Sequence, residues 1–353
     1  MRTSGLRMWF AAIMLAIIFS IALPVNAAQD VPQALKQIIG LYEGGGERFL
    51  LRENGGRVEL VYDLSDNGTP FSVCAVYPLQ AMTGDEYRLE APNPLGRVSG
   101  GIRIMRDHEG FGTVCRIGTN VYHRRFFDPE KGLIYQIKPQ ASLEKLREIA
   151  AAASPPREQG DFLLPDLVNV VSLDSTIKVD IRYATNDNFM GIALYDRARA
   201  YLQRSAAEAL VRAHTKLAGH GYGIIIHDAY RPWAVTKMFW DATPDAQKIF
   251  VADPTKGSRH NRGGAVDISL YDLATGQPVA MISDFDEFSL RAHPSYPGGT
   301  ALERWRRDLL RIYMEAEGFT VYDEEWWHFD YKDWRKYPVM NSSFAELDAA
   351  GSQ

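Results

Sequence analysis

Short apolar runs alternate with turn sequences between residues 42 and 127. The runs at 49–52 and 58–62 flank Asn54-Gly55-Gly56, which is typical of a tight turn between two antiparallel strands. Because further strand-like runs follow near 87–89 and 101–105, we predict a small β-rich domain over residues 29–140.

The second half of the chain mixes helical and strand-like patterns. Apolar residues at helical spacing over 206–217 are followed by the continuous apolar run 222–227, which predicts a helix and then a buried strand. Pro232 suits the first turn of another helix, and Thr300 with Glu303 forms a capping-box pattern before a later one. This mixture predicts an α+β fold.

Residues 141–162 are predicted to connect the two regions. An alanine-rich helical stretch at 143–153 runs into Pro155 and Pro156, which stop a helix, and polar residues follow them. We therefore place a linker there and a second domain at 163–345.

The first 28 residues have the order of a secretory signal peptide. Arg2 and Arg7 precede an apolar run over 8–23, and small residues follow it. The run is shorter than the roughly 20 residues that span a bilayer, so an uncleaved anchor is the alternative. We expect cleavage after Ala27 or Ala28, membrane contact only during export, and a periplasmic or secreted product without a lipid anchor.

Composition and charge narrow the classes of function. The chain has 353 residues, of which 46% are hydrophobic and 24% charged, as in globular proteins, and its formal net charge is −5. The sequence has no Lys/Arg cluster dense enough to bind along the phosphate backbone of a nucleic acid, so we expect no nucleic-acid partner. Because export favours oxidised thiols, Cys74 and Cys115 could form one disulfide; two buried thiols in neighbouring strands are the alternative.

Two segments of the second half contain the residue types of a metal site. After His260, Gly263 and Gly264 allow a tight turn into a strand with Asp267, so the imidazole and the carboxylate could share a cation. A histidine hydrogen-bonded to a strand carboxylate is the alternative. His328, among aromatics, could be a ligand or a packed core histidine. Two imidazoles and one carboxylate together suit zinc with one open position for water.

Two further residues have the chemistry that such a site needs. Glu325 is the natural general base, close to the metal without binding it. Residues three apart on a regular strand face opposite sides, so Glu325 should lie in a loop or bulge before the strand of His328. Arg231 ends an apolar strand and could stabilise a developing oxyanion, with a structural salt bridge as the alternative.

Three motifs in this half resemble the D-alanyl-D-alanine dipeptidases, the VanX-type zinc peptidases of family M15. They are Asp-Ala-Tyr-Arg-Pro at 228–232, Ser-x-His-x-x-Gly-x-Ala-x-Asp at 258–267, and Glu-Trp-Trp-His at 325–328. The resemblance covers roughly 164–338. It implies a hedgehog-like D,D-peptidase fold, with a small central antiparallel sheet and flanking helices.

The resemblance also implies a role for each matching residue. His260, Asp267 and His328 would bind one Zn²⁺ per chain, Glu325 would be the catalytic base, and Arg231 would stabilise the transition state.

Three further residues would bind substrate by the same resemblance. Asp286 would meet the substrate ammonium, Ser258 would line the pocket, and Tyr183 would form part of its wall.

The expected reaction is zinc-dependent hydrolysis of D-alanyl-D-alanine, or a similar D,D-dipeptide, to free D-amino acids. A D,D-carboxypeptidase or endopeptidase acting on peptidoglycan stem peptides is the nearest alternative, since export favours it. A non-catalytic cell-wall-binding module is the third, although the presence of Glu325 and Arg231 argues against it. The short members of the family lack the β-rich domain, for which peptidoglycan is a candidate partner.

Overall fold

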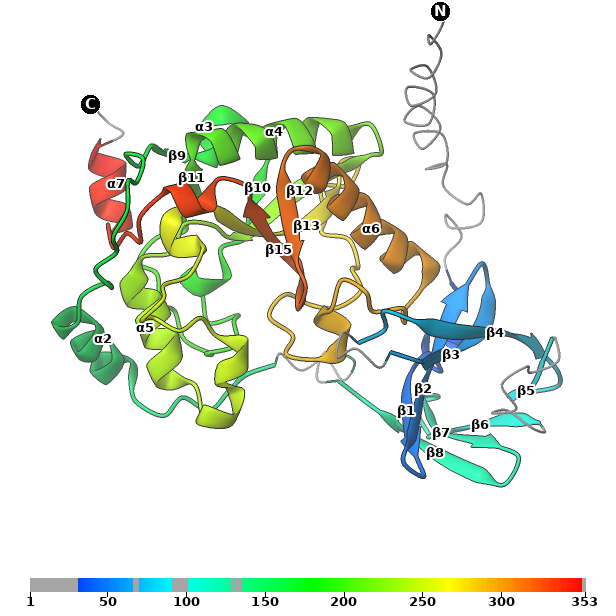
Figure 1. Cartoon of the computed structure of the whole chain (residues 1–353). Helices are drawn as coiled ribbons and strands as arrows, with labels where there is room; N and C mark the ends of the chain where they lie inside the picture. The colour runs from blue at the N-terminus through cyan, green and yellow to red at the C-terminus, as the bar shows by residue number, and fades with distance from the viewer. Residues whose placement is uncertain (1–30, 66–69, 91–100, 128–129, 131–134, 351–353) are drawn as a thin grey trace, which may run out of the picture.

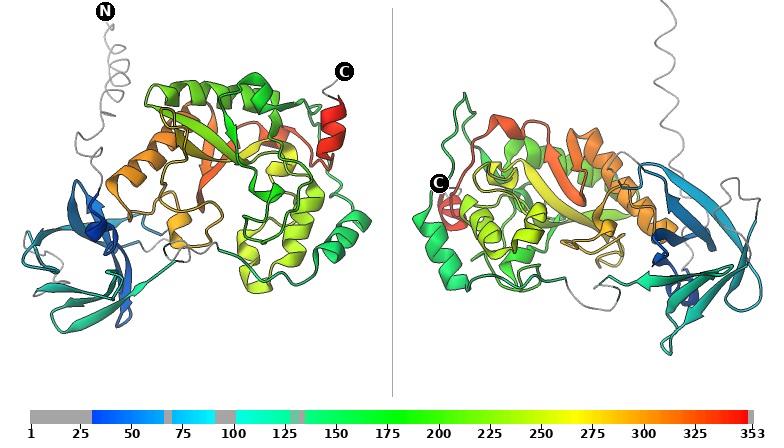
Figure 2. Two further views of the ribbon diagram at one scale, coloured as in Figure 1. Left: turned by 180° about the vertical axis from the view of Figure 1, so that it is seen from behind. Right: turned by 60° about the horizontal axis from the view of Figure 1, so that its bottom comes forward.

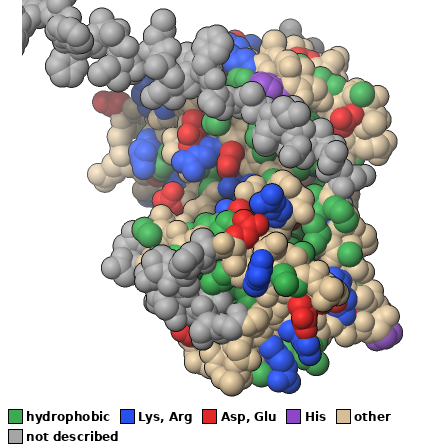
Figure 3. Space-filling view, turned by 90° about the vertical axis from the view of Figure 1, so that its right-hand side faces the viewer, with side chains coloured by type: hydrophobic (Ala, Val, Ile, Leu, Met, Phe, Trp, Pro, Cys, Tyr) green, Lys and Arg blue, Asp and Glu red, His purple; other side chains and the backbone are tan. Residues whose placement is uncertain are grey.

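A computed structural model describes residues 31–65, 70–90, 101–127, 130 and 135–350, so the predicted signal peptide lies outside the described residues. The chain forms a β-barrel and a larger α+β region beside it (Figure 1). Among the described residues, no helix has the length and apolarity to cross a membrane. On the face drawn in Figure 3, basic and acidic side chains are intermixed.

The first region is a closed antiparallel barrel, which confirms that this part of the chain is β-rich. After the short helix α1 (Gln33–Lys36), its strands are β1 (Gly40–Gly44), β2 (Glu47–Asn54), β3 (Arg57–Asp63), β4 (Cys74–Ala81), β5 (Glu86–Leu89), β6 (Ile102–Arg106), β7 (Gly112–Ile117) and β8 (Asn120–Arg125). The predicted turn at Gly55 and Gly56 joins β2 to β3. The sheet closes because β8 pairs with β1.

Side chains that alternate along the barrel strands fill its interior. The centre of the Phe49 ring lies 4.9 Å from the ring centre of Tyr122 and 5.7 Å from that of Tyr42. His108 is exposed, and His123 lies exposed on β8.

The two cysteines are free thiols. Cys74 lies on β4 and Cys115 on β7, with β5 and β6 between them in the barrel order. They are therefore neither joined by a disulfide nor on neighbouring strands, because the order of the closed sheet separates them. Cys115 is buried and Cys74 is half-buried.

The second region is built on a five-stranded sheet. Its order is β10 (Lys178–Val179), β12 (Tyr222–Asp228), β13 (Ala265–Asp272), β15 (Glu325–Tyr331) and β14 (Phe319–Tyr322). All neighbours are antiparallel except β10, which runs parallel to β12. A separate pair consists of β9 (Leu167–Asn169) and β11 (Tyr201–Gln203). The expected small antiparallel sheet is therefore present, with one short parallel strand at its edge.

Helices flank this sheet (Figure 2). They are α2 (Leu143–Ala152), α3 (Val170–Leu173), α4 (Arg204–Ala218), α5 (Trp233–Ala242), α6 (Ala301–Ala316) and α7 (Phe344–Ala350). The predicted apolar stripe of α4 is buried, and α4 and α6 contact each other and the sheet strands. Pro232 precedes α5, and Thr300 forms the predicted capping box with Glu303. Local sequence signals thus determine these helix starts.

The segment 141–162 includes the helix α2. Leu146 and Ala150 of α2 are buried in the apolar core of the α+β region, and α2 packs against α5. Further along, Glu158 forms an ion pair with Arg262. This stretch therefore packs against the α+β region.

Candidate active site

The strand register brings the charged residues of the sheet together. Asp267 on β13 lies opposite His328 on β15 and opposite Asp228 on β12. His260 begins the short 3₁₀ helix η4 (His260–Arg262), which ends at Gly263 with φ +64°. A Cβ atom on Gly263 would lie 2.4 Å from a methyl carbon of Leu167, so both the left-handed turn and the close packing require glycine.

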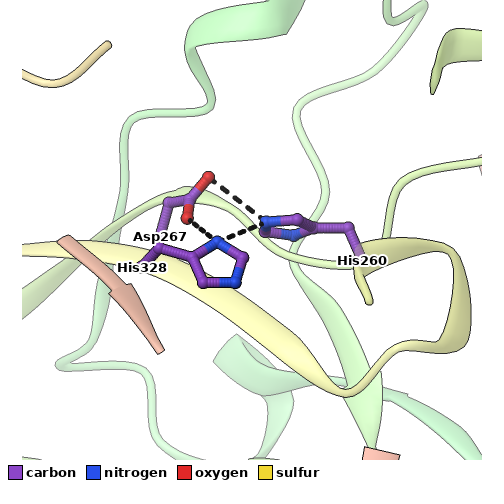
Figure 4. Close-up of side chains that lie close together, drawn as sticks. All are labelled: His260, Asp267 and His328. Atoms are coloured by element: carbon purple, nitrogen blue, oxygen red, sulfur yellow. Dashed lines mark hydrogen bonds and ion pairs between the residues drawn. The ribbon is translucent and has the colours of Figure 1, made fainter. Parts of the chain in front are cut away.

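The predicted metal ligands form one buried cluster (Figure 4). His328 Nδ1 lies 3.0 Å from Asp267 Oδ1, His260 Nε2 lies 3.4 Å from Asp267 Oδ2, and the two facing nitrogens are 3.1 Å apart. Ligand atoms about 2.0–2.1 Å from a tetrahedral zinc ion are about 3.3 Å from one another. The spacing and the donor types therefore fit zinc.

Outer hydrogen bonds orient both imidazoles. His260 Nδ1 lies 2.7 Å from the carbonyl oxygen of Ala229, and His328 Nε2 lies 3.0 Å from Asp330 Oδ1. If each of these nitrogens donates its proton, the other nitrogen keeps a lone pair that faces the cluster, as in many zinc sites. Asp330 was not among the predicted site residues, although its i+2 spacing from His328 on one strand places both on the same face.

The cluster favours an ionised carboxylate. Burial opposes the charge of Asp267, but His260 and His328 together lower the pKa of this carboxyl far below its usual range. Burial also opposes a charge on His328, whereas Asp267 and Asp330 raise its pKa to about 10. A divalent cation would compete with that proton for the Nδ1 lone pair.

Glu325 lies beside the cluster in the predicted kind of irregularity. It pairs with Tyr322, while Phe329 pairs with Val321, so the β14–β15 ladder loses its regular register between these positions. The Oε2 atom of Glu325 lies 3.8 Å from His328 Nδ1. Burial, together with the charge of Asp267, raises the pKa of Glu325 to about 7. Its neighbour Glu324 is instead largely exposed at the pocket wall, and its Oε2 atom lies 3.6 Å from His293 Nε2.

Arg231 lies between the end of β12 and the start of α5, as predicted. Its Nε and Nη2 atoms donate to Asp228 Oδ2 at 2.9 and 2.7 Å, and Nη2 lies 4.0 Å from Asp267 Oδ2. Burial opposes the charge of Arg231, but Asp228 raises its pKa well above the usual value. The structural salt bridge that was the alternative interpretation of this arginine is therefore present, and the same guanidinium group also lies near Asp267.

Asp228 is a buried partner that sequence reasoning missed. Its Oδ1 atom accepts a hydrogen bond of 2.7 Å from the Tyr195 hydroxyl, and its Oδ2 atom binds Arg231. Its signals in the sequence were its place as the first residue of the motif at 228–232 and its position three residues before Arg231, at the end of an apolar strand. That spacing alone does not identify a salt bridge, because the chain leaves the strand there.

The predicted substrate-binding residues lie in the same region. The Tyr183 hydroxyl donates to Asp286 Oδ2 at 2.8 Å, and Asp286 has a left-handed backbone with φ +58°. Burial and the charge of Asp267 raise the pKa of Asp286 well above its usual value. The hydroxyl oxygen of Ser258 accepts a hydrogen bond from the backbone N–H of His260.

One pocket of about 710 Å³ joins all eight predicted residues. They are Tyr183, Arg231, Ser258, His260, Asp267, Asp286, Glu325 and His328. Aromatic side chains supply much of the remaining wall: Phe189, Phe239, Phe250, Phe288, Tyr322, Trp327 and Trp334. The arrangement combines cation ligands, a carboxylate with a raised pKa and a buried arginine, as expected of a hydrolytic site.

Comparisons with known sequences agree with the interpretation of this pocket as a hydrolytic site. Residues 165–347 match the family model described as D-ala-D-ala dipeptidase, of peptidase family M15. The D-alanyl-D-alanine dipeptidase of Escherichia coli K12 is 34% identical over 188 residues, which is 53% of this chain and 96% of that protein. The D-alanyl-D-alanine dipeptidase of Enterococcus faecium is 35% identical over 186 residues, which is 48% of this chain and 91% of that protein.

The chain therefore belongs to the D-Ala-D-Ala dipeptidase family and is a metallopeptidase. Among solved structures, an LD-carboxypeptidase studied for peptidoglycan recognition is similar, with 16% identity and a TM-score of 0.27 over 56% of this chain and 75% of that one. A TM-score at this level does not establish a shared fold.

Proposed function

We propose that this enzyme hydrolyses D-alanyl-D-alanine, or a similar D,D-dipeptide, with one zinc ion held by His260, Asp267 and His328. The observation that carries the proposal is that these three residues, Glu325 and Arg231 line one pocket. When bound, zinc supplies Lewis-acid activation of water and of the scissile carbonyl group.

Glu325 is proposed to move the proton. Its carboxylate is near the ligand cluster but is not one of the three converging ligands. A raised pKa makes it a stronger base than an exposed glutamate, so it can take a proton from the attacking water and return it to the leaving amine.

Arg231 is proposed to stabilise the oxyanion. Because Asp228 accepts hydrogen bonds from both Nε and Nη2, the guanidinium group is fixed in one orientation. A fixed, fully charged donor stabilises a developing negative charge without reorganising first.

Asp286 is proposed to bind the ammonium group of the substrate, with Tyr183 orienting its carboxyl group through the 2.8 Å hydrogen bond. A bound ammonium would favour the ionised form of this buried carboxyl group. Ser258 completes the pocket wall beside His260.

A second candidate is a D,D-carboxypeptidase or endopeptidase acting on peptidoglycan stem peptides. Pockets of about 300–1,000 Å³ hold drug-sized ligands, and free D-Ala-D-Ala is smaller than these. The pocket of about 710 Å³ leaves room for a longer peptide, and the predicted export signal gives access to the cell wall.

One experiment separates the two candidates. The purified mature protein is offered D-Ala-D-Ala and an N-acylated D-Ala-D-Ala stem analogue, each with and without a chelator. We expect chelator-sensitive release of D-alanine from the free dipeptide. Faster cleavage of the acylated analogue would favour the stem-peptide activity, whereas turnover of neither would contradict both.

We also propose a periplasmic or secreted location and a hedgehog-like fold for the domain at 163–345. The location rests on the signal-peptide pattern at 1–28, and N-terminal sequencing of the native protein, with a start near Ala28 or Gln29, tests it. An intact Met1 in a membrane fraction would establish an anchor instead. Peptidoglycan binding by the barrel stays a prediction.

A further inference from the structure

The pocket wall that includes Asp286 is a loop without regular structure. Residues 282–289 lead into the short 3₁₀ helix η5 (Leu290–Ala292), and Asp286, Glu287, Phe288 and Ser289 line the pocket. A left-handed backbone at a residue other than glycine is strained, so it persists only where the surroundings hold it. The loop therefore needs support to present Asp286.

Arg291 contacts residues near both ends of this loop. Its Nε atom donates to the carbonyl oxygen of Ile282 at 3.2 Å and lies 3.3 Å from Glu287 Oε1. Glu287 is buried and accepts a hydrogen bond from the Ser289 hydroxyl. One guanidinium group thus connects the beginning, the middle and the end of the loop.

The same guanidinium group reaches the segment that follows β8, the last barrel strand. Arg291 Nη1 lies 3.8 Å from Glu130 Oε1, and its Cζ atom lies 5.7 Å from the ring centre of Phe127. Glu130 accepts a hydrogen bond of 2.8 Å from Arg124 on β8 and another from the backbone N–H of Phe127. Arg291 is therefore held between the pocket loop and the residues that follow the last barrel strand.

Further contacts fix the barrel to the segment that follows η5. The Ser295 hydroxyl donates to the carbonyl oxygen of Pro70 at 2.9 Å, and the Phe71 and Tyr296 rings pack edge to face. Glu53 on β2 accepts a hydrogen bond from the backbone N–H of Ala301, the first residue of α6. The views in Figures 1 and 2 agree that the barrel lies beside the end of α6. The barrel therefore contacts this segment at several points.

We propose that the barrel is a positioning element of the substrate pocket, acting through Arg291 and Glu130 on the loop that presents Asp286. This inference rests on the proposed role of Asp286 in binding the substrate ammonium. Arg291 and Glu130 touch neither the metal ligands nor Glu325, so they affect substrate binding and leave the chemical step alone. The barrel sets the affinity for short D,D-peptides with a free amino end.

The test compares two variants that act from opposite sides. Glu130→Gln removes the carboxylate that Arg124 of β8 holds, with little change in shape, and Arg291→Met removes the cation that contacts the loop. Each should raise KM for D-Ala-D-Ala about 2- to 30-fold, with kcat and zinc content nearly unchanged. Arg291→Lys should restore part of the loss. Arg106→Met, which removes a half-buried arginine at the end of β6 that pairs with Asp85, is the matched control.

Two results would overturn the proposal. One is an unchanged KM in both variants, and the other is a fall in kcat with KM unchanged. In the Asp286→Asn background, Arg291→Met should add little to KM, because the carboxylate through which it acts is already gone. A full additive increase there would show that Arg291 acts elsewhere.

Hydrogen exchange makes the test independent of turnover. Peptides covering 283–289 should exchange faster in Glu130→Gln than in the wild type or in Arg106→Met. Unchanged exchange would contradict the support of the loop by the barrel. If the wild type released no D-alanine from D-Ala-D-Ala, the proposed function would fail, and the exchange result would still decide this inference.

Discussion

The barrel and the central sheet bury charge in different ways. In the barrel, Glu59 pairs with Arg52 at 2.7 Å, and Arg124 pairs at 2.8 Å with Glu130, which follows β8. Beside the sheet, two imidazoles and a carboxylate converge, and one ligand atom from each lies within 4.8 Å of the others. Paired charges need no further ligand, whereas convergent donors are costly to bury without a cation.

The strands of the two regions also differ in how their side chains are buried. On β6 and β8, buried and exposed side chains alternate, as expected where one face packs inside a barrel. On β12 and β13 nearly every residue is buried, because helices cover one face and the site occupies the other. The barrel strands therefore mainly pack against one another, whereas the sheet strands also position the side chains of the candidate site.

Loss of a metal ligand should have the largest effect. We expect His260→Ala, Asp267→Ala or His328→Ala each to abolish stoichiometric zinc binding and turnover, since a catalytic site has three protein ligands. Elemental analysis of the purified variants measures this. Stoichiometric zinc in all three single variants would contradict the ligand assignment and remove the difference between the two regions.

Glu325→Gln should lower kcat about 10²–10⁴-fold, the range typical of a general base, because the amide cannot accept the proton. Zinc content and melting temperature should stay close to those of the wild type.

Glu324→Gln is the matched control, because Glu324 is adjacent in sequence but largely exposed, near His293. Loss of turnover in the control, with activity retained in Glu325→Gln, would reverse the assignment of the base.

Arg231→Ala should lower kcat about 10²–10³-fold, as for loss of one oxyanion donor. It should also destabilise the fold by about 3–5 kcal/mol, because it leaves the buried carboxylate of Asp228 without its partner. Steady-state kinetics and urea unfolding measure the two effects. Unchanged stability would show that the carboxylate is not held by this pair.

Phe49→Ala should cost about 3–5 kcal/mol of unfolding free energy, as expected for loss of a buried ring in the barrel core. Zinc content should not change, since the ligands come from the other region. A loss of zinc on this substitution would contradict the separation of packing and metal binding between the two regions.

Reducing agent should have the smallest effect. Because Cys74 and Cys115 are free and lie on strands that are not neighbours, dithiothreitol should leave the melting temperature unchanged. A marked fall in melting temperature would indicate a disulfide and therefore a different order of the barrel strands.

The sequence by itself determined the local elements and the identity of the candidate residues. Turn residues such as Gly55 and Gly56 and the capping box at Thr300 act over a few residues, so their patterns predict structure without knowledge of the rest of the chain. The glycines after His260 likewise predicted a turn toward Asp267, and all eight candidate site residues line one pocket.

Only the tertiary structure decided the contacts between distant segments. Closure of the barrel depends on the pairing of β1 with β8, which joins positions near 41 and 125. The contact of Asp267 with His328 and that of Arg291 with Glu130 likewise join residues that are far apart in the chain. Such contacts follow from strand register and packing over the whole chain, which no local pattern specifies.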